Sequence, residues 1–125
     1  MGGIHDVLER LSEYYRDFST LELDKITPYF HEPALLIGAA GMVMAPDHAA
    51  LRAVLARTID DLRSRSYERS EFLVREFTEF NTKTCSVRGI AVRYRTGGQE
   101  LERVRLTYLL SLTGTWRIAV MIIED

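Results

Sequence analysis

The chain has 125 residues, 46% hydrophobic and 27% charged, with 16 basic and 18 acidic side chains, three histidines and one cysteine. This length predicts one domain, residues 1–125, around one core, and the near-neutral charge argues against a dedicated nucleic-acid binder. One cysteine forms no internal disulfide, and it builds no four-ligand zinc site with the histidines at these spacings.

The sequence predicts neither a membrane span nor a targeting segment. The uncharged run at residues 33–45 is shorter than the roughly 20 apolar residues that cross a bilayer, and the first residues lack the build of a signal peptide. The run also contains Gly38 and Gly41, but Met44 stands where a dinucleotide-binding loop needs its third glycine. We therefore expect a cytoplasmic protein with no cofactor, no metal and no membrane partner.

Three helices are predicted in the first half of the chain. Residues 4–18 place apolar side chains along one face at helical spacing. A short helix over residues 20–27 follows a capping-box pattern at residues 19–22 and ends near Pro28. Asp47 is the expected N-cap of a third helix, whose buried stripe is Leu51, Val54, Leu55, Ile59 and Leu62.

The remaining segments predict strands. Residues 33–45 favour a hairpin of two buried strands, and residues 71–80, 84–95, 100–113 and 116–123 are rich in β-branched and aromatic side chains. Gly97 and Gly98 predict a two-residue turn. Counting outward from that turn pairs Arg95 with Glu100, Arg93 with Glu102 and Val87 with Tyr108.

This order of elements predicts an α+β domain in which helices cover one face of an antiparallel sheet. Residues 118–123 are apolar at both alternating positions, so both faces of the last strand need cover. Helices cover only one face, and we expect a homodimer through the outer sheet face that includes this strand. On this interpretation Met121→Lys dissociates the dimer.

The ordered motifs resemble a known superfamily over nearly the whole chain. They are Leu23-Asp24-Lys25-Ile26, Tyr29-Phe30, a hairpin, His48-Ala49-Ala50-Leu51-Arg52 opening a helix, and Gly114-Thr115-Trp116-Arg117-Ile118 before the last strand. Together they resemble the nuclear transport factor 2-like superfamily, in its SnoaL-like and ketosteroid-isomerase-like branch. The resemblance implies a cone-shaped, cystatin-like fold in which a curved sheet and N-terminal helices enclose an apolar pocket, generally in a homodimer. Members include isomerases, polyketide cyclases and non-catalytic binding or scaffold proteins, so fold alone does not settle function.

The resemblance also implies where catalytic groups would lie. Steroid isomerases of this branch use a helix-one tyrosine, a protonated aspartate on a late strand and a carboxylate base, a system that serves as a standard example of pKa tuning. Matching the motifs puts Tyr14 at the tyrosine, Tyr108 at the aspartate and Gly38 at the base. Two candidate hydrogen-bond donors are therefore present and the base is missing, which leaves open whether the protein is an enzyme.

No other residue clearly replaces the base. His31 is expected in an exposed turn, and Glu76 is either a buried base or, as we favour, turned outward by a β-bulge. Cys85 is expected to be a small core residue, and Arg93 to pair with Glu102 at the sheet tip.

Two functions follow from these residues. The first is the binding of a small, mostly apolar ligand, or an isomerase-like or cyclase-like reaction with Tyr14 and Tyr108 as donors. The expected pocket lining is Tyr14, Leu36, Leu55, Val87, Tyr108, Leu110 and Trp116. The second is a dimeric scaffold whose cone is filled by its own side chains, with Met42, Met44 and Phe77 as candidates. A cavity of several hundred Å³ with inward hydroxyls favours the first function, and a filled cone favours the second.

Overall fold

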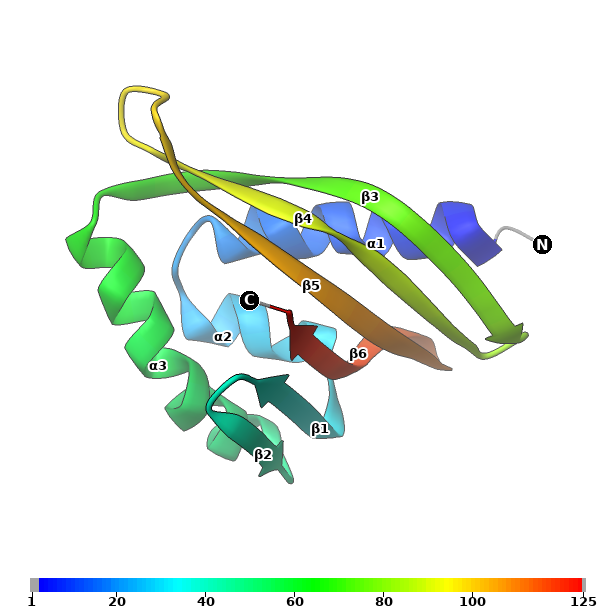
Figure 1. The fold of residues 1–125 in the computed structure, drawn as a ribbon. Coiled ribbons are helices and arrows are strands. Elements are labelled where there is room, and N and C mark those ends of the chain that lie inside the picture. Colours follow the sequence, from blue (N-terminus) through cyan, green and yellow to red (C-terminus); the bar gives the residue numbers. More distant parts are fainter. Residues whose placement is uncertain (1–2, 125) are drawn as a thin grey trace.

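The computed structural model describes residues 3–124 as three helical segments followed and interleaved by six strands (Figure 1). The elements in chain order are α1 (Gly3–Phe18), α2 (Leu23–Ile26), a 3₁₀ turn (Thr27–Tyr29), β1 (Phe30–Gly38), β2 (Gly41–Ala45), α3 (His48–Ser64), β3 (Tyr67–Asn81), β4 (Thr84–Arg95), β5 (Glu100–Thr113) and β6 (Thr115–Ile123).

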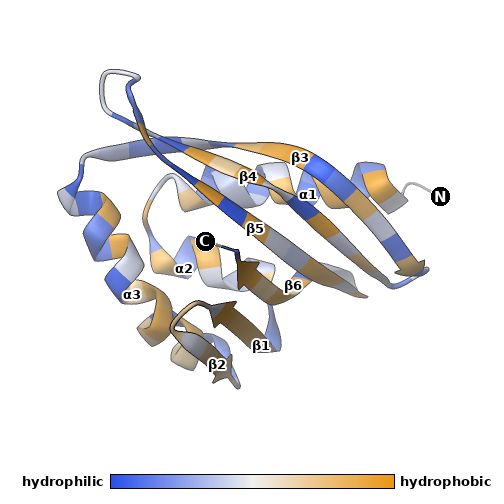
Figure 2. Ribbon diagram, in the orientation of Figure 1, coloured by the Kyte–Doolittle hydropathy of each residue, from blue (hydrophilic) through white to orange (hydrophobic). Residues whose placement is uncertain are grey.

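The strands form one curved, open sheet in the order β2-β1-β6-β5-β4-β3. All neighbouring strands are antiparallel except β1 and β6, which are parallel, so the expected all-antiparallel sheet is corrected at this one pair. The helices lie on one side of the sheet, and hydrophobic residues recur along the elements that face each other across this layer (Figure 2). The fold is thus the α+β arrangement that the sequence predicts.

The predicted helices are confirmed, with one local difference. The apolar stripe of α1 is buried, and Asp47 caps α3 by accepting a hydrogen bond from the amide of Ala50 at 2.8 Å. The predicted capping box is wrong, because the Ser19 hydroxyl donates to the carbonyl of Tyr15 and no side chain caps α2. The first hydroxyl is therefore used to end α1 and not to begin α2.

The register of β4 and β5 matches the prediction, although the turn differs. Arg95 pairs with Gln99 around a three-residue loop in which Gly97 and Gly98 both have positive φ. Next to this loop the pairing is shifted by one residue from the predicted register, so that Tyr94 lies opposite Glu100. A bulge at Leu101 restores the predicted register, in which Arg93 lies opposite Glu102 and Val87 opposite Tyr108. The predicted pair of Arg95 with Glu100 is wrong for the same reason.

Two further bulges decide which side chains face the helices. A bulge in β3 turns Glu76 to the outer face opposite Arg88, as the sequence favoured. A bulge in β6 at Ala119 places both Ile118 and Met121 on the inner face, where they are buried. Met121 is therefore not a dimer-face residue, and the expected effect of Met121→Lys on a dimer is withdrawn.

The hairpin of β1 and β2 is confirmed, but β2 is not buried. It is an edge strand, and Met42 and Met44 are 65% and 60% exposed. They pair with Ile37 and Leu35 on the outer face of the sheet, so they do not fill the cone. Phe77, in contrast, is half-buried and packs against the core.

Candidate functional site

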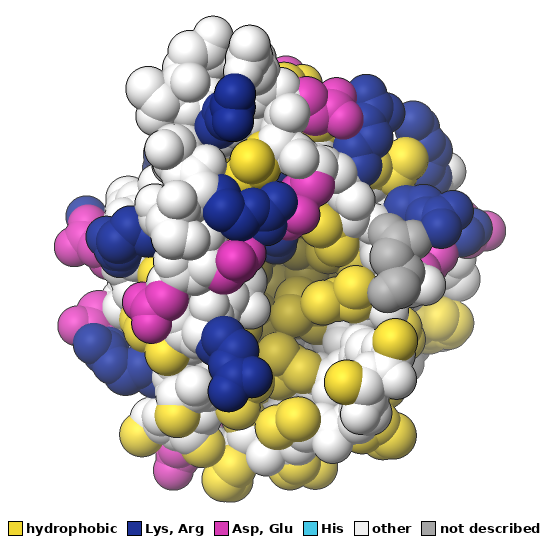
Figure 3. All heavy atoms as spheres, turned by 60° about the vertical axis from the view of Figure 1, so that its left-hand side comes forward, with side chains coloured by type: hydrophobic (Ala, Val, Ile, Leu, Met, Phe, Trp, Pro, Cys, Tyr) yellow, Lys and Arg dark blue, Asp and Glu magenta, His cyan; other side chains and the backbone are white. Residues whose placement is uncertain are grey.

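A small enclosed cavity lies between the helices and the inner face of the sheet. Its volume is about 60 Å³, and we call it the phenol cavity. Seen from the side of α3, the molecule is hollowed and hydrophobic side chains line the hollow (Figure 3). The cavity is lined by Tyr14, Tyr15, Phe18, Leu55, Thr58, Ala91, Arg93, Val104, Leu106, Tyr108, Met121 and Ile123.

Three tyrosines gather at this cavity. Helix α1 supplies Tyr14 and Tyr15, and β5 supplies Tyr108 from the centre of the sheet. The hydroxyls of Tyr15 and Tyr108 are 2.5 Å apart, and the hydroxyl of Tyr14 also interacts with that of Tyr108. The rings of Tyr14 and Tyr108 meet edge to face, with centroids 6.0 Å apart. The three phenols therefore form one buried hydroxyl cluster inside an aromatic core.

Burial keeps these phenols protonated. Desolvation raises the pKa of Tyr14, Tyr15 and Tyr108 well above the ordinary value of 10.0, because the buried environment penalises the phenolate. Charge interactions with the neighbouring phenols raise these pKa values further. The positive charge of Arg93 lowers all three, and hydrogen bonds among the phenols lower those of Tyr15 and Tyr108 in part. At neutral pH the cluster thus offers neutral hydroxyl groups and no base.

Arg93 connects the cavity to an ion-pair network. Its guanidinium lies 5.8 Å from the ring of Phe18, and it donates to Glu102 at 2.6 Å. Glu102 also accepts from Arg65 at 2.8 Å, which ties the end of α3 to β5. The two arginines lower the pKa of Glu102 against its partial burial, so the carboxylate stays charged and neutralises part of the positive charge beside the cavity.

No general base lines the phenol cavity among the described residues. The position that the resemblance assigns to the base, Gly38, lies at the end of β1 opposite Gly41, away from this cavity. His31 is half-buried with its Nδ1 2.9 Å from the carbonyl oxygen of Pro33, and Glu76 is exposed on the outer face. Cys85 is buried, and burial raises the pKa of its thiol to about 11, which makes it a poor nucleophile.

The structure brings together only part of the predicted pocket lining. Tyr14, Leu55 and Tyr108 lie at the phenol cavity. The remaining candidates do not line it: Val87 and Leu110 are fully buried core residues, Leu36 packs against the core, and Trp116 lies near the start of α1. These side chains therefore belong to the packed core beyond the cavity.

Among the lining residues that were not sequence candidates, Tyr15 and Arg93 contribute a hydroxyl and a charge to the site. Tyr15 was assigned only to the buried stripe of the first helix, and Arg93 only to pairing at the sheet tip. The pairing of Arg93 with Glu102 is confirmed, but the same side chain also lines the cavity. Alternation along β4 places Arg93 on the same face as Val87 and Ala91, and that is the signal that would have identified it.

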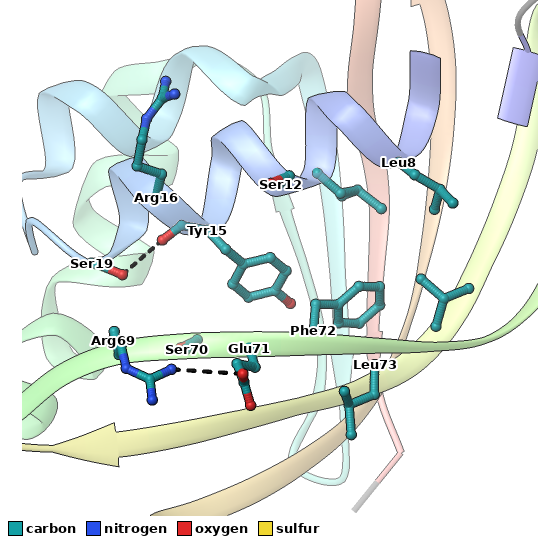
Figure 4. A pocket seen from close by; sticks show the side chains of 12 residues that line it. Leu8, Ser12, Tyr15, Arg16, Ser19, Arg69, Ser70, Glu71, Phe72 and Leu73 are labelled. Carbon is teal, nitrogen blue, oxygen red and sulfur yellow. Dashed lines mark hydrogen bonds and ion pairs between the residues drawn. The ribbon is translucent and has the colours of Figure 1, made fainter. Parts of the chain in front are cut away.

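A second, larger space lies on the surface between α1 and β3 (Figure 4). Its volume is about 620 Å³, and we call it the α1–β3 groove. Tyr15 and Phe72 lie between the helix and the strand, and their rings stack at 5.2 Å and 17°. The groove is lined by Leu8, Leu11, Ser12, Tyr15, Arg16, Ser19, Arg69, Ser70, Glu71, Phe72, Leu73 and Val74.

Within residues 3–124 no cluster of histidine, cysteine and acidic side chains could hold a metal ion. None of the helices in that range is long and apolar enough to cross a membrane.

Comparisons with known proteins agree with this fold. No curated protein matches the chain in sequence. An NTF-2 like protein of unknown function from Shewanella oneidensis MR-1 superposes with a TM-score of 0.79 at 16% identity, over 98% of each chain. A ketosteroid isomerase-like protein from Erwinia carotovora atroseptica superposes with a TM-score of 0.69 at 11% identity, over 97% of this chain and 95% of that one.

A third solved structure carries a different functional description. A putative aromatic ring hydroxylase from Novosphingobium aromaticivorans superposes with a TM-score of 0.70 at 15% identity, over 98% of this chain and 87% of that one. Identities this low show a shared fold and no shared activity. The model of the family described as "NTF2-like protein (DUF6841)" matches residues 5–125, and the chain therefore belongs to this NTF2-like family.

Proposed function

We propose that this protein binds a small, mostly apolar molecule through one hydrogen-bond-accepting oxygen at the phenol cavity, without catalysing a reaction on it. The hydroxyl cluster of Tyr14, Tyr15 and Tyr108 carries the proposal. Three hydroxyls in a chain hold three protons, and the two contacts among them use two. One proton is left at an end of the chain, where a carbonyl or ether oxygen would accept it.

The surrounding side chains favour a neutral ligand. Around the hydroxyls the lining is largely hydrocarbon, and the one cation, Arg93, is already paired with Glu102. General acid-base catalysis needs a group that titrates near neutrality within reach of the substrate, and the described lining offers none. A single phenol donating to a carbonyl therefore supports binding and not proton transfer.

A matched pair of probes tests this function. Cyclopentanone and cyclopentane differ in one carbonyl group, and we expect only the ketone to shift the NMR signals of Tyr14, Tyr15 and Tyr108 saturably. The ends of the hydroxyl chain are Tyr14 and Tyr15. Of Tyr14→Phe and Tyr15→Phe, the variant that loses the donating end should weaken binding about fivefold, because one hydrogen bond of about 1 kcal/mol is lost. Tyr94→Phe is the control, since the Tyr94 hydroxyl donates to Glu71 on the outer face. Equal binding of both probes, or no saturable shift, would reject the proposal.

A second candidate function is a dimeric scaffold, and the small cavity volume favours it. About 60 Å³ is well below the roughly 300 Å³ at which small-molecule sites begin. The outer face of β2, β1 and β6 is apolar, and Leu109 of β5 continues it. The other half of this face, on β3, β4 and the rest of β5, is mostly polar, with Arg88, Arg103 and Arg105 beside Ile90 and Val92. We propose that a second copy covers the apolar half, which consists of Leu35, Ile37, Met42, Met44, Leu109, Val120 and Ile122.

Light scattering tests the dimer. Ile122→Lys places a charge in the apolar half of the outer face and should convert a dimer to a monomer at micromolar concentration. Thr78→Lys, on the polar half of the same face, is the matched control and should leave the mass unchanged. A wild-type protein that is already monomeric at this concentration contradicts the proposal.

A further inference from the structure

Tyr15 separates two neighbouring spaces. It is the one described residue that lines both the phenol cavity and the α1–β3 groove. Its ring stacks on Phe72 toward the groove, and its hydroxyl reaches Tyr108 toward the cavity. A change in the position of this single side chain would therefore join the two spaces.

The phenol cavity and the α1–β3 groove, which Tyr15 separates, differ greatly in volume. The phenol cavity alone, at about 60 Å³, is too small for a ligand of ordinary size. The groove, at about 620 Å³, falls within the roughly 300–1,000 Å³ of small-molecule sites. Hydrogen-bonding groups and space are thus found on opposite sides of the Tyr15 ring.

The contacts that hold Tyr15 are reversible. Its ring makes stacking and edge contacts, and its hydroxyl contact to Tyr108 is a hydrogen bond between neutral groups. Phe72, its partner, lies directly over Gly89, where an added Cβ would come within 2.6 Å of the Phe72 ring. The absence of a side chain at Gly89 therefore allows Phe72 to take this position. Phe72 and Tyr15 together form the wall between the groove and the cavity. A rotamer change of Tyr15 would open that wall without breaking an ion pair.

The inner surface of the groove is apolar. Leu8, Leu11, Phe72 and Val74 are among its lining residues. Leu8 and Phe72 lie beside Tyr15 toward the start of α1 (Figure 4). The guanidinium groups of Arg16 and Arg69 point away from the space between α1 and β3 (Figure 4), and Arg69 lies over the ring of Tyr94, 4.2 Å from its centroid. The groove thus suits a hydrocarbon chain and offers no inward charge for a second polar group.

We propose that the α1–β3 groove is the outer half of the ligand site and that Tyr15 is the movable wall between the two halves. The ligand is then elongated, with an acceptor oxygen at the phenols and an unbranched apolar tail along α1. This inference deepens the proposed function and rests on it, because the phenol cavity must first hold the oxygen.

Two ketones of different length test the inference. Cyclopentanone reaches only the phenol cavity, whereas methyl nonyl ketone adds a long tail to the same carbonyl group. Ser12→Trp fills the groove from an exposed position of α1, and Thr58→Trp fills the α3 side of the cavity from an exposed position of α3. We expect Ser12→Trp to weaken methyl nonyl ketone about tenfold, the loss of about two buried methylene groups, and to leave cyclopentanone unchanged.

The outcomes separate the two proposals. If cyclopentanone fails to bind the wild-type protein, the phenol cavity is not a ligand site and the proposed function fails. If cyclopentanone binds but Ser12→Trp leaves methyl nonyl ketone unaffected, or Thr58→Trp alone weakens it, the tail does not occupy the groove and this inference is overturned. An amide NMR spectrum of each variant shows that it is folded, since both substitutions are on exposed helix positions.

Discussion

On the inner face of β4 and β5 the side chains are hydrophobic or phenolic up to the Arg93–Glu102 pair near the hairpin tip, whereas the outer face of the same strands carries Arg88, Arg103 and Arg105 beside Ile90 and Val92. Val87 and Tyr108 form one inner pair and are almost fully buried, while Arg88 and Thr107 beside them are bound to Glu124 on the outside. Toward β6 and β1 the outer face becomes apolar as well. The difference teaches that alternation along a strand predicts which residues share a face only as far as the next bulge. Beyond a bulge, the inward and outward positions are exchanged.

The largest contrast between the faces is expected at two adjacent residues of β6. Met121→Lys places a charge among the phenol-cavity residues and should lower the free energy of unfolding by about 3 kcal/mol. Val120→Lys, on the outer face, should cost less than about 1 kcal/mol in the monomer. Urea unfolding at low protein concentration measures both. Similar losses for the two variants would show that the β6 bulge is wrongly placed.

Gly89→Ala should have the next largest effect on the inner face. The added methyl group would meet the carbonyl oxygen of Leu73 at 2.5 Å and the ring of Phe72 at 2.6 Å. We expect a loss of about 1–3 kcal/mol in unfolding free energy and a weaker stack between Phe72 and Tyr15. Gly38→Ala is the control, because nothing lies within 4 Å of the added Cβ there. Equal stability of the two variants would contradict the close approach.

The phenol cluster predicts a loss of stability at alkaline pH. The pKa values of Tyr14, Tyr15 and Tyr108 are higher in the folded chain than the ordinary value of 10.0. Their contribution to stability is therefore complete below pH 10 and is lost as the pH rises through the folded pKa values. Tyrosinate absorbance should show these three phenols ionising only as the chain unfolds. Titration of all six tyrosines before unfolding would contradict the burial of the cluster.

The smallest effect is expected on the charged outer face. Arg103 and Glu100 form an exposed ion pair with nitrogen and oxygen 3.0 Å apart. Arg103→Gln should leave the urea midpoint indistinguishable from that of the wild-type protein, because water and salt screen such pairs. A clear shift of the midpoint would mean that this surface is covered in solution.

Much of the fold follows from local patterns in the sequence. Helical spacing identifies the buried stripe of α1, the Asp47 carboxylate identifies the start of α3, and alternation pairs Val87 with Tyr108. The bulge in β6 was not foreseen, because residues 118–123 are apolar at every position and alternation carries no information there. The parallel pairing of β1 with β6 also depends on contacts distant in sequence.

The candidate site was predictable only in part. Tyr14 and Tyr108 could be proposed from the resemblance, and both lie at the cavity. Tyr15 could not be singled out, because two adjacent tyrosines on a helix point in different directions that only tertiary packing resolves. The exposed side chains of Met42 and Met44 likewise depend on β2 being an edge strand.

The tip of the β4–β5 hairpin contains one residue more than its pairing requires. The loop at residues 96–98 shifts the two strands by one position, and the bulge at Leu101 shifts them back. A deletion of one loop residue can therefore be compensated if the bulge straightens, with every pair from Arg93 and Glu102 onward kept. The hairpin tip can thus change in length while the residues beyond the bulge keep their inner and outer faces. Evolution or design can therefore insert or delete a residue there without exchanging the two faces of the sheet.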